Sequence, residues 1–289
     1  MPPSIFSGNY LLSGDTGGYQ APIPWDRSVF GSEFGGRTLG EVCDQKEQCR
    51  LCLARPGSDE IACSDQFSTK LGDPQLLYEC VSADAMFACA HLFQAEGPEL
   101  EIRPFCISMS EGGAREHATL KGKSVMNFVT ACGPTGAYYF VAEDVGPAHR
   151  DLFRSGAEGP AEVIGGDVGT LDDRKLNSIA VSIQDEVYLL YSGPHGKPPT
   201  SAFFIVIDSA GNQVHRSALL HSKFGFGNVG GIMVSRDGTA YVGVNYFEHT
   251  TELGYDVYSS GGRFMLTSSG EVSQLPCMTT EFGLRVVDN

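Results

Sequence analysis

Four segments of the sequence repeat one hairpin pattern at a spacing near 50 residues, and this repeat predicts an all-β fold, the β-propeller. In each segment a short apolar run leads through a tight polar turn into a second apolar or aromatic run. The segments are Glu79–Ala90, Phe128–Ala142, Ile179–Tyr191 and Ile232–Val244. Single residues keep the spacing as well, since Asn127 and Asn177 are 50 residues apart. Such a repeat is typical of blades of four antiparallel strands around an axis.

The remaining strands follow from the hairpins in chain order, beginning with a short first blade expected from Arg37 to Thr69. The outer strands of later blades are expected at Glu99–Ser108, Asp151–Arg154 with Ala161–Ile164, Phe203–Val214 and Arg263–Val272. Residues 1–36 and the strand Phe282–Val287 cannot each form a blade. We expect them to pair and close the ring, which removes exposed sheet edges. The prediction is one domain over residues 1–289 with six blades, or five if the N-terminal segment is a cap.

The composition limits the classes of partner. Of the residues, 42% are hydrophobic, 19% are charged and 36 are glycines, which suits short strands joined by many turns. A formal net charge of −15, with no Lys/Arg cluster to offset it, repels nucleic acid and anionic membrane surfaces, so we expect neither as a partner. No apolar run is long enough to span a membrane. No signal peptide pattern is visible, which leaves a cytoplasmic protein or a secreted one whose signal has been removed.

The nine cysteines allow several arrangements. Four of them cluster early in the chain, and two of these form a CxxC pair. They are Cys43, Cys49, Cys52 and Cys63. A structural zinc site usually needs a second close pair, and none follows, so zinc is not favoured. Cys80 and Cys89 flank the turn at Asp84–Ala85, and we expect them to face each other across the hairpin. Buried thiols are favoured there over a disulfide.

Two blade openings resemble a known group of propellers. The segments Gly231–Gly243 and Leu176–Ser182 are similar to blade openings of the six-bladed senescence-marker-protein/gluconolactonase and strictosidine-synthase group. The resemblance implies a fold more than a function. It places any site for a small ligand at the mouth of the central channel, where the openings of the blades and the loops between second and third strands meet.

The same resemblance raises the question of a metal. In the gluconolactonase group a divalent cation on the axis is held by one Glu, two Asn-type groups and an Asp. By resemblance, Glu41 matches the Glu, and Asn127 and Asn177 match the amides, but Gly230 stands where the Asp would be. One carboxylate makes a weak site for an oxygen-loving cation. We therefore expect no cofactor, with one divalent cation as the alternative; the two asparagines are otherwise expected to line a pocket or to cap backbone groups of their turns.

Histidines recur after the second strand of four blades, at His91, His149, His195 and His249. Histidine carries protons near neutral pH, and acidic neighbours such as Glu143 or Glu248 can orient it. His149 and His195, together with Asn127 and Asn177, are the expected catalytic residues; solvated loop histidines are the alternative. The expected substrate contacts are His91, Arg174, Phe226, Asn228, Tyr246 and His249.

Three functions fit these features. The first is a metal-independent cyclase or isomerase of natural-product biosynthesis that acts on a small, largely apolar substrate at the channel mouth. The second is a metal-dependent lactone or ester hydrolase of the gluconolactonase type. The third is a non-catalytic propeller that binds a ligand or partner. The missing Asp counts against the second and the absence of repeated loop residues against a multivalent lectin, which leaves the first as the expected function.

Overall fold

The computed structural model describes residues 32–34, 37–43, 48–54, 60–68, 75–84, 86–96, 99–121, 123–144, 149–193, 201–217, 219, 228–234, 238–248, 257–266 and 272–275. Within these residues the chain forms twenty-three β-strands and no helix. The strands pair in antiparallel fashion and group into five sheets that follow one another along the sequence. The described part of the chain is therefore all-β, as the hairpin repeat predicts.

Each sheet takes its strands from one continuous stretch of the chain. The first contains β1 (Ser32–Phe34), β2 (Arg37–Cys43), β3 (Gln48–Ala54), β4 (Ile61–Cys63) and β5 (Phe67–Ser68). The second contains β6 (Gln75–Val81), β7 (Phe87–Glu96), β8 (Glu99–Ser108), β9 (Ala114–Glu116) and β10 (Leu120–Lys121). The third contains β11 (Lys123–Cys132), β12 (Tyr138–Asp144), β13 (Arg150–Ser155) and β14 (Glu162–Gly165). The fourth contains β15 (Thr170–Leu171), β16 (Arg174–Val181), β17 (Val187–Gly193), β18 (Ser201–Ile207) and β19 (Gln213–Arg216). The fifth contains β20 (Asn228–Val234), β21 (Ala240–Glu248), β22 (Val257–Leu266) and β23 (Val272–Leu275).

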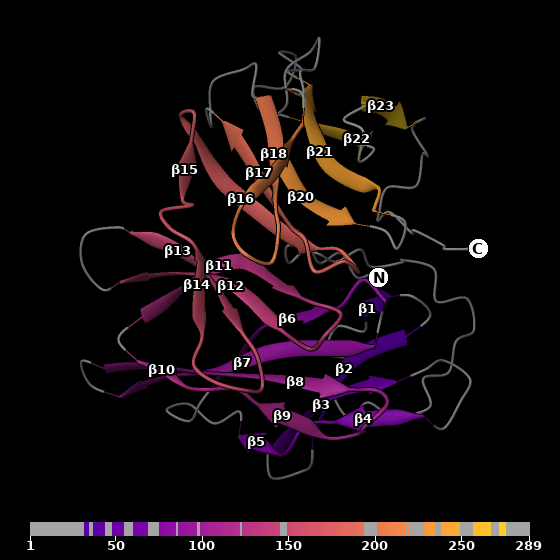
Figure 1. Ribbon diagram of the computed structural model, residues 1–289. Coiled ribbons are helices and arrows are strands. Elements are labelled where there is room, and N and C mark those ends of the chain that lie inside the picture. The colour runs from indigo at the N-terminus through magenta and orange to yellow at the C-terminus, as the bar shows by residue number, and fades with distance from the viewer. Residues whose placement is uncertain are drawn as a thin grey trace.

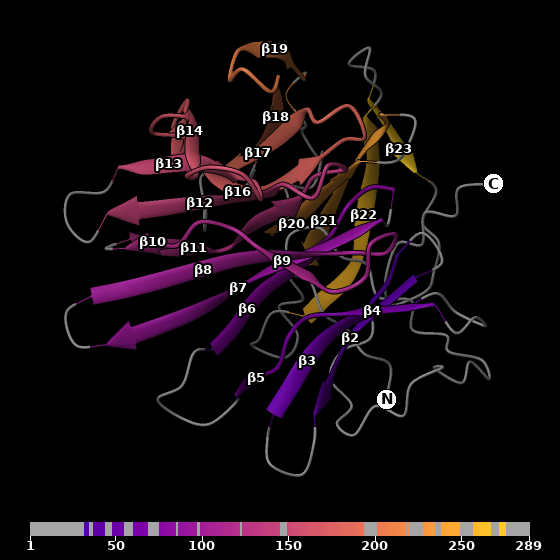
Figure 2. The ribbon, with the colours of Figure 1, turned by 60° about the horizontal axis from the view of Figure 1, so that its bottom comes forward.

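The first long strands of the second to fifth sheets lie side by side. β6 contacts β11, β11 contacts β16, and β16 contacts β20. Figures 1 and 2 show the sheets fanning outward from these inner strands in different directions. Antiparallel sheets arranged in this way around a common centre fit a β-propeller. Five sheets are present among the described residues; the strand Phe282–Val287, expected to close a sixth blade, lies outside them.

The hairpin repeat has a common physical basis in a buried serine. The backbone N–H of Ser82 donates to the carbonyl of Phe87 at 2.9 Å, and the N–H of Ser182 donates to the carbonyl of Glu186 at 2.9 Å. Each hydroxyl accepts from the backbone across the same turn, from Phe87 N at 3.0 Å and from Glu186 N at 3.2 Å. Both serines are fully buried. They close equivalent turns in two different sheets, and this shared role explains why the two serines recur 100 residues apart in the sequence.

The core lies between neighbouring sheets, and β12 shows how the sequence builds it. Successive side chains of a strand point to opposite faces. Tyr138 and Phe140 pack toward the second sheet, whereas Tyr139 and Val141 pack toward the fourth. All four side chains are fully buried. Each buried aromatic side chain contributes about 2–3 kcal/mol through loss of apolar surface, so β12 ties three sheets together.

Several strand bounds agree with the sequence-based expectation, and one differs in a way that affects the site. β8 spans Glu99–Ser108 as expected, and β2 to β5 fall within the expected first blade. The second strand of the second sheet, expected to end near Ala90, continues to Glu96 because β8 pairs with it along its whole length. His91 therefore lies inside β7 and not on a loop.

The cysteines are more oxidised than expected. Disulfides join Cys52 to Cys63 and Cys89 to Cys106. Cys80 lies opposite Cys89 across the β6–β7 hairpin and is a buried thiol, both as predicted. The prediction of a thiol at Cys89 is wrong, because Cys89 is bonded to Cys106 on the other side. Among the described residues, no helix is long and apolar enough to cross a membrane.

Candidate functional site

The starts of the inner strands and the connections between second and third strands, which the sequence analysis places at a channel mouth, lie at the same end of the third and fourth sheets. In the fourth sheet Lys175 lies opposite Ser192, and Gly193 lies opposite Ser201. The start of the inner strand β16, the end of β17 and the start of β18 are therefore at the same end of the sheet. The third sheet is built alike, with the start of β11 and the start of β13 both paired to the end of β12.

Each of the four neighbouring inner strands has an irregularity close to this end. The pairing register shifts between Leu77 and Cys80 on β6 and between Val125 and Thr130 on β11. On β16 the register shifts at Asn177, between Leu176 and Ser178. On β20 it shifts at Gly230, between Val229 and Gly231. Each shift begins one or two residues after the first residue of its strand. Such bulges leave a residue out of the ladder, bend the strand and redirect side chains, and they are frequent beside active sites.

Asn127 and Asn177 both fall in these irregularities, on adjacent inner strands. The side chain of Asn177 is half-buried, and its Nδ2 donates to Ser192 Oγ at 3.3 Å. Ser192 is fully buried, so the amide is held from the second strand of the same sheet. The hydroxyl of Ser178, the next residue, accepts from the backbone N–H of Ile232 at 3.4 Å and so ties β16 to β20 just past the bulge.

Arg174 is fixed at the first residue of β16. Its Nε and Nη2 donate to Ser201 Oγ at 3.1 and 2.7 Å, and its Nη1 donates to the carbonyl of Asp172 at 2.9 Å. The guanidinium carbon lies 5.7 Å from the centre of the Phe203 ring, within the range of a cation–π contact. These bonds join the starts of β16 and β18, so Arg174 brings a positive charge to the site end with its position set by the scaffold.

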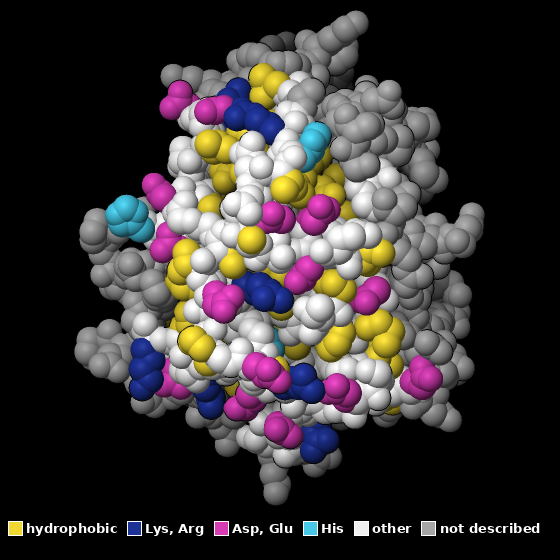
Figure 3. Space-filling model, viewed as in Figure 1, with side chains coloured by type: hydrophobic (Ala, Val, Ile, Leu, Met, Phe, Trp, Pro, Cys, Tyr) yellow, Lys and Arg dark blue, Asp and Glu magenta, His cyan; other side chains and the backbone are white. Residues whose placement is uncertain are grey.

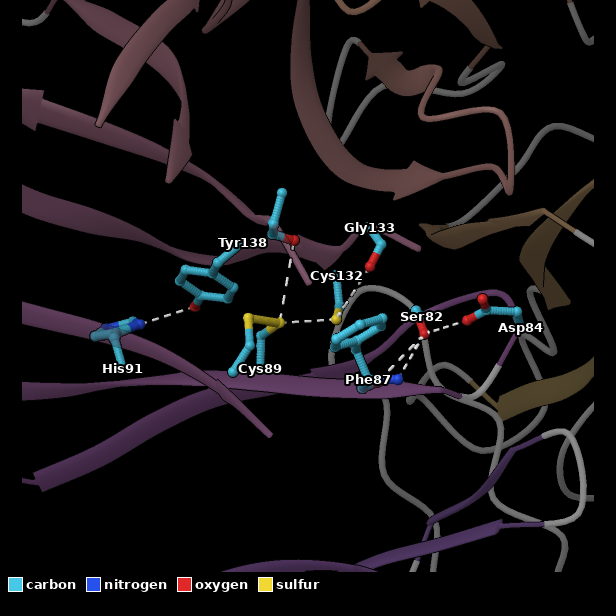
Figure 4. The surroundings of a disulfide bond; sticks show 10 residues. Ser82, Asp84, Phe87, Cys89, His91, Cys132, Gly133 and Tyr138 are labelled. Carbon is cyan, nitrogen blue, oxygen red and sulfur yellow. Dashed lines mark hydrogen bonds between the residues drawn. A yellow bond between two sulfur atoms is a disulfide. The ribbon is translucent and has the colours of Figure 1, made fainter. Parts of the chain in front are cut away.

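His91 lies in the core, on β7 opposite Leu77, where the irregularity of β6 begins. It is fully buried on β7, and its Nδ1 is 2.8 Å from the hydroxyl of Tyr138 on β12 (Figure 4). Burial lowers the pKa of His91 to about 3, so the ring is neutral at physiological pH. A neutral, buried histidine bonded to a tyrosine links two sheets and has no contact with solvent.

His149 is exposed and lies one residue before β13, two strands outward from β11 in the third sheet. Glu143, a candidate for orienting a histidine, instead accepts from Arg150 Nε at 3.0 Å. The structure therefore brings Asn127 and Asn177 to neighbouring strands and places His149 farther from the axis. The remaining candidates His195, Phe226 and His249 lie outside the described residues.

Three other candidates are located only by strand and register. Asn228 is the first residue of β20, opposite Asn245. Tyr246 lies on β21, opposite Ser259. Glu41, the only carboxylate of the conditional metal set, lies on β2 opposite Leu51.

The opposite end holds a polar network that the sequence did not point to. Arg154 Nε donates to the Tyr139 hydroxyl at 3.1 Å, and Arg154 Nη2 donates to Asp185 Oδ2 at 3.3 Å. Burial raises the pKa of Tyr139, and the carboxylate of Asp185 adds to the effect. Asp185 belongs to the β16–β17 turn and has a φ of 65°, so a turn of the fourth sheet is locked onto two strands of the third. The only sequence signal is the recurrence of an Asp after the hairpin serine, as in Asp84.

The face of the molecule shown in Figure 3 is mixed in charge. On the face shown in Figure 3, Asp and Glu side chains are scattered among apolar side chains and among Lys and Arg. Some acidic side chains are paired, for example Glu143 with Arg150 and Glu111 with Arg115. This distribution gives the described face no extended basic surface of the kind that binds nucleic acid.

The comparisons with known proteins bear on fold alone. No family model and no curated protein matches the sequence. Two solved structures of prolyl oligopeptidase B from Galerina marginata, one bound to a 25mer macrocyclization substrate and one to a 35mer hydrolysis and macrocyclization substrate, align with TM-scores of 0.52 and 0.51 at 12% and 11% identity. Both alignments cover 87% of this chain and 34% of the oligopeptidase chain, so this chain spans about a third of their length.

A third structure, the β-propeller domain of the Trilobed protease from Pyrococcus furiosus, aligns with a TM-score of 0.44 at 11% identity, over 70% of this chain and 57% of that domain. The two prolyl oligopeptidase structures, with TM-scores above 0.5, are similar to this chain in fold. The likeness supports the propeller fold. It does not establish membership of the gluconolactonase and strictosidine-synthase group.

Proposed function

We propose that the protein is an enzyme that isomerises or cyclises a small, largely apolar substrate at the mouth of a propeller channel without a metal. One observation carries the proposal: the bulges recur at the same level of the four adjacent inner strands β6, β11, β16 and β20. A single bulge is a local feature of one strand. Four on neighbouring strands place the backbones of Asn127, Asn177 and Gly230 near the start of adjacent inner strands.

The residues at these bulges suit chemistry on a carbonyl oxygen. Asn127 and Asn177 supply amides from adjacent strands, and Ser192 orients the amide of Asn177. An amide N–H donates to an oxygen that gains negative charge as a neighbouring C–H loses its proton. His149 lies two strands outward from β11, so the proposal assigns to the other expected histidine, His195, the removal of that proton and its return to a different carbon, which changes the position of a double bond or closes a ring.

The donor set fits a metal less well. Glu41 is the single carboxylate among the candidate ligands, and Gly230, in the bulge of β20, offers no side chain at all. A divalent cation bound by one carboxylate and two amides would be held weakly. The proposal therefore assigns no step to a metal, and Arg174, anchored by Ser201, supplies positive charge at the same end of the fourth sheet.

The proposal is tested by incubating the purified full-length protein with a panel of enolisable ketones, lactones and aryl esters in D₂O buffer, with and without EDTA. Isomerisation or cyclisation through an enol introduces deuterium into a ketone while its composition stays otherwise unchanged. Hydrolysis instead adds one water to a lactone or ester. Mass spectrometry of the small molecules separates the two reactions.

We expect deuterium exchange or rearrangement that EDTA does not slow. Hydrolysis that stops on chelation would replace the proposal with the metal-dependent hydrolase. Binding of panel members in a thermal-shift assay without conversion of any would assign the protein to the non-catalytic binding propellers.

A further inference from the structure

Four cysteines from two neighbouring sheets meet in the core. Cys80 on β6 lies opposite Cys89 on β7, and Cys89 lies opposite Cys106 on β8, so the three form a row across the second sheet. Cys132, at the end of β11 in the third sheet, packs against this row (Figure 4). All four side chains are buried.

The four sulfur atoms are in two oxidation states. Cys89 and Cys106 form a disulfide, whereas Cys80 and Cys132 are thiols. The Sγ atom of Cys132 is 2.8 Å from the Sγ atom of Cys89, and the sulfur atoms of Cys89, Cys106 and Cys132 all lie within 4.8 Å of one another. Cys80 is hydrogen-bonded to Cys132. A thiol therefore contacts a disulfide, and a second thiol is hydrogen-bonded to the first.

We propose that these four residues form a thiol–disulfide exchange site that moves a disulfide from within one blade to between two blades. Cys132 loses its proton, and its sulfur attacks Cys89 Sγ. The bond from Cys89 to Cys106 breaks, and the electron pair leaves with Cys106 Sγ, which takes up the proton. The products are a Cys89–Cys132 disulfide and a Cys106 thiol, so no external oxidant or reductant is consumed.

A second step completes the transfer. Cys80 attacks Cys132 in the same way, which forms a Cys80–Cys132 disulfide and releases Cys89 as a thiol. Either product joins the second sheet to the third covalently, whereas the starting disulfide links only β7 to β8. The exchange thus converts a bond that holds one blade together into a bond that fixes two blades to each other.

The surroundings of Cys132 make the exchange slow and dependent on pH. The groups that face it are Cys80 from β6, Asp84 from the β6–β7 turn, and the disulfide of Cys89 and Cys106. Burial raises the pKa of the Cys132 thiol, and Cys80 and Asp84 raise it further, against a smaller opposing effect of the Ser82 backbone. Because the thiolate is the attacking species, the exchange rate rises about tenfold for each unit of pH below that pKa.

The test is native-state alkylation of the full-length protein with iodoacetamide at pH 7 and pH 9, followed by an acid quench, denaturation and peptide mapping without reduction. Cleavage at Asp and Glu residues places the four cysteines on four different peptides. We expect Cys106 to become alkylated, faster at the higher pH, while a disulfide to Cys132 accumulates. In the Cys132→Ser variant, alkylation of Cys106 should be at least about tenfold slower.

A second variant keeps the test decisive if Cys132→Ser does not fold. Cys80→Ser leaves the first step intact and removes the second, so the disulfide between Cys89 and Cys132 should be the only new one. Alkylation of Cys80 and Cys132 in the wild type with the original disulfide fully retained would overturn the proposal. So would one equivalent of zinc bound by four reduced thiols.

Discussion

His91 allows a quantitative test of the core between the second and third sheets. Its ring is fully buried and bonded to Tyr138, and burial lowers its pKa from the usual 6.5 to about 3. Below pH 6.5 the unfolded chain binds a proton at this residue that the folded protein does not. The contribution of His91 to the free energy of unfolding is therefore fully present above pH 6.5 and is lost as the pH falls toward 3.

The size of this effect follows from the two pKa values. Each pH unit between them costs about 1.4 kcal/mol of unfolding free energy, so lowering the pH from 7 to 5 costs about 2 kcal/mol through His91 alone. Carboxylates and the buried His117, whose pKa is lowered to about 4, also contribute to the pH dependence of the wild type. A His91→Gln variant isolates the one residue, because all other groups titrate equally in both proteins.

The assay is urea unfolding followed by far-UV circular dichroism at pH 7 and pH 5. Between pH 7 and pH 5 we expect the free energy of unfolding to fall by about 2 kcal/mol more in the wild type than in His91→Gln. This expectation does not depend on the difference in stability between the two proteins at pH 7. Equal pH dependence in His91→Gln and the wild type would refute the burial of His91 and return it to a solvent-accessible site.

Three further outcomes follow from the structure. Gly211→Ala should lower stability by about 2–3 kcal/mol, because Gly211 has a φ of 85° and an added Cβ would overlap the carbonyl oxygen of Ile164. Gly159→Ala, with a φ of 82° but open space around it, should cost only about 1 kcal/mol in the same thermal or urea unfolding assay. Arg154→Met should cost about 1 kcal/mol, since it removes the partly exposed ion pair with Asp185, and a double-mutant cycle with Asp185→Asn measures the coupling. Elemental analysis should find no stoichiometric divalent cation, and dialysis against EDTA should leave the melting temperature unchanged.

The hairpin strands and turns of the fold were predictable from the sequence. The turns were predictable because a buried serine, such as Ser82 or Ser182, recurs in them at a fixed spacing along the chain. The opposition of Cys80 and Cys89 was predictable from the turn between them. The choice of disulfide was not, because Cys89 has a cysteine on each neighbouring strand, and spacing along the chain cannot decide between them.

The site was less accessible to sequence reasoning. His91 was expected on a loop because the apolar run ends near Ala90, but pairing with β8 extends β7 and takes the histidine into the core. The bulges around Asn127, Asn177 and Gly230 arise from the register between strands, which the sequence of a single strand does not encode. The amides were nevertheless found as candidates, since their spacing of 50 residues follows the blade repeat.

The proposed site at the inner strands is tested most directly through the two asparagines in the bulges, Asn127 and Asn177. With any substrate or ligand that the panel assay yields, Asn127→Ala and Asn177→Ala are compared with Asn212→Ala, which alters an exposed asparagine in the β18–β19 turn. We expect each bulge variant to lower kcat at least about tenfold while its melting temperature stays near that of the wild type, because loss of a donor to a developing oxyanion weakens catalysis more than folding. Asn212→Ala should match the wild type in both measurements. Wild-type turnover by both bulge variants would contradict a site at the inner strands.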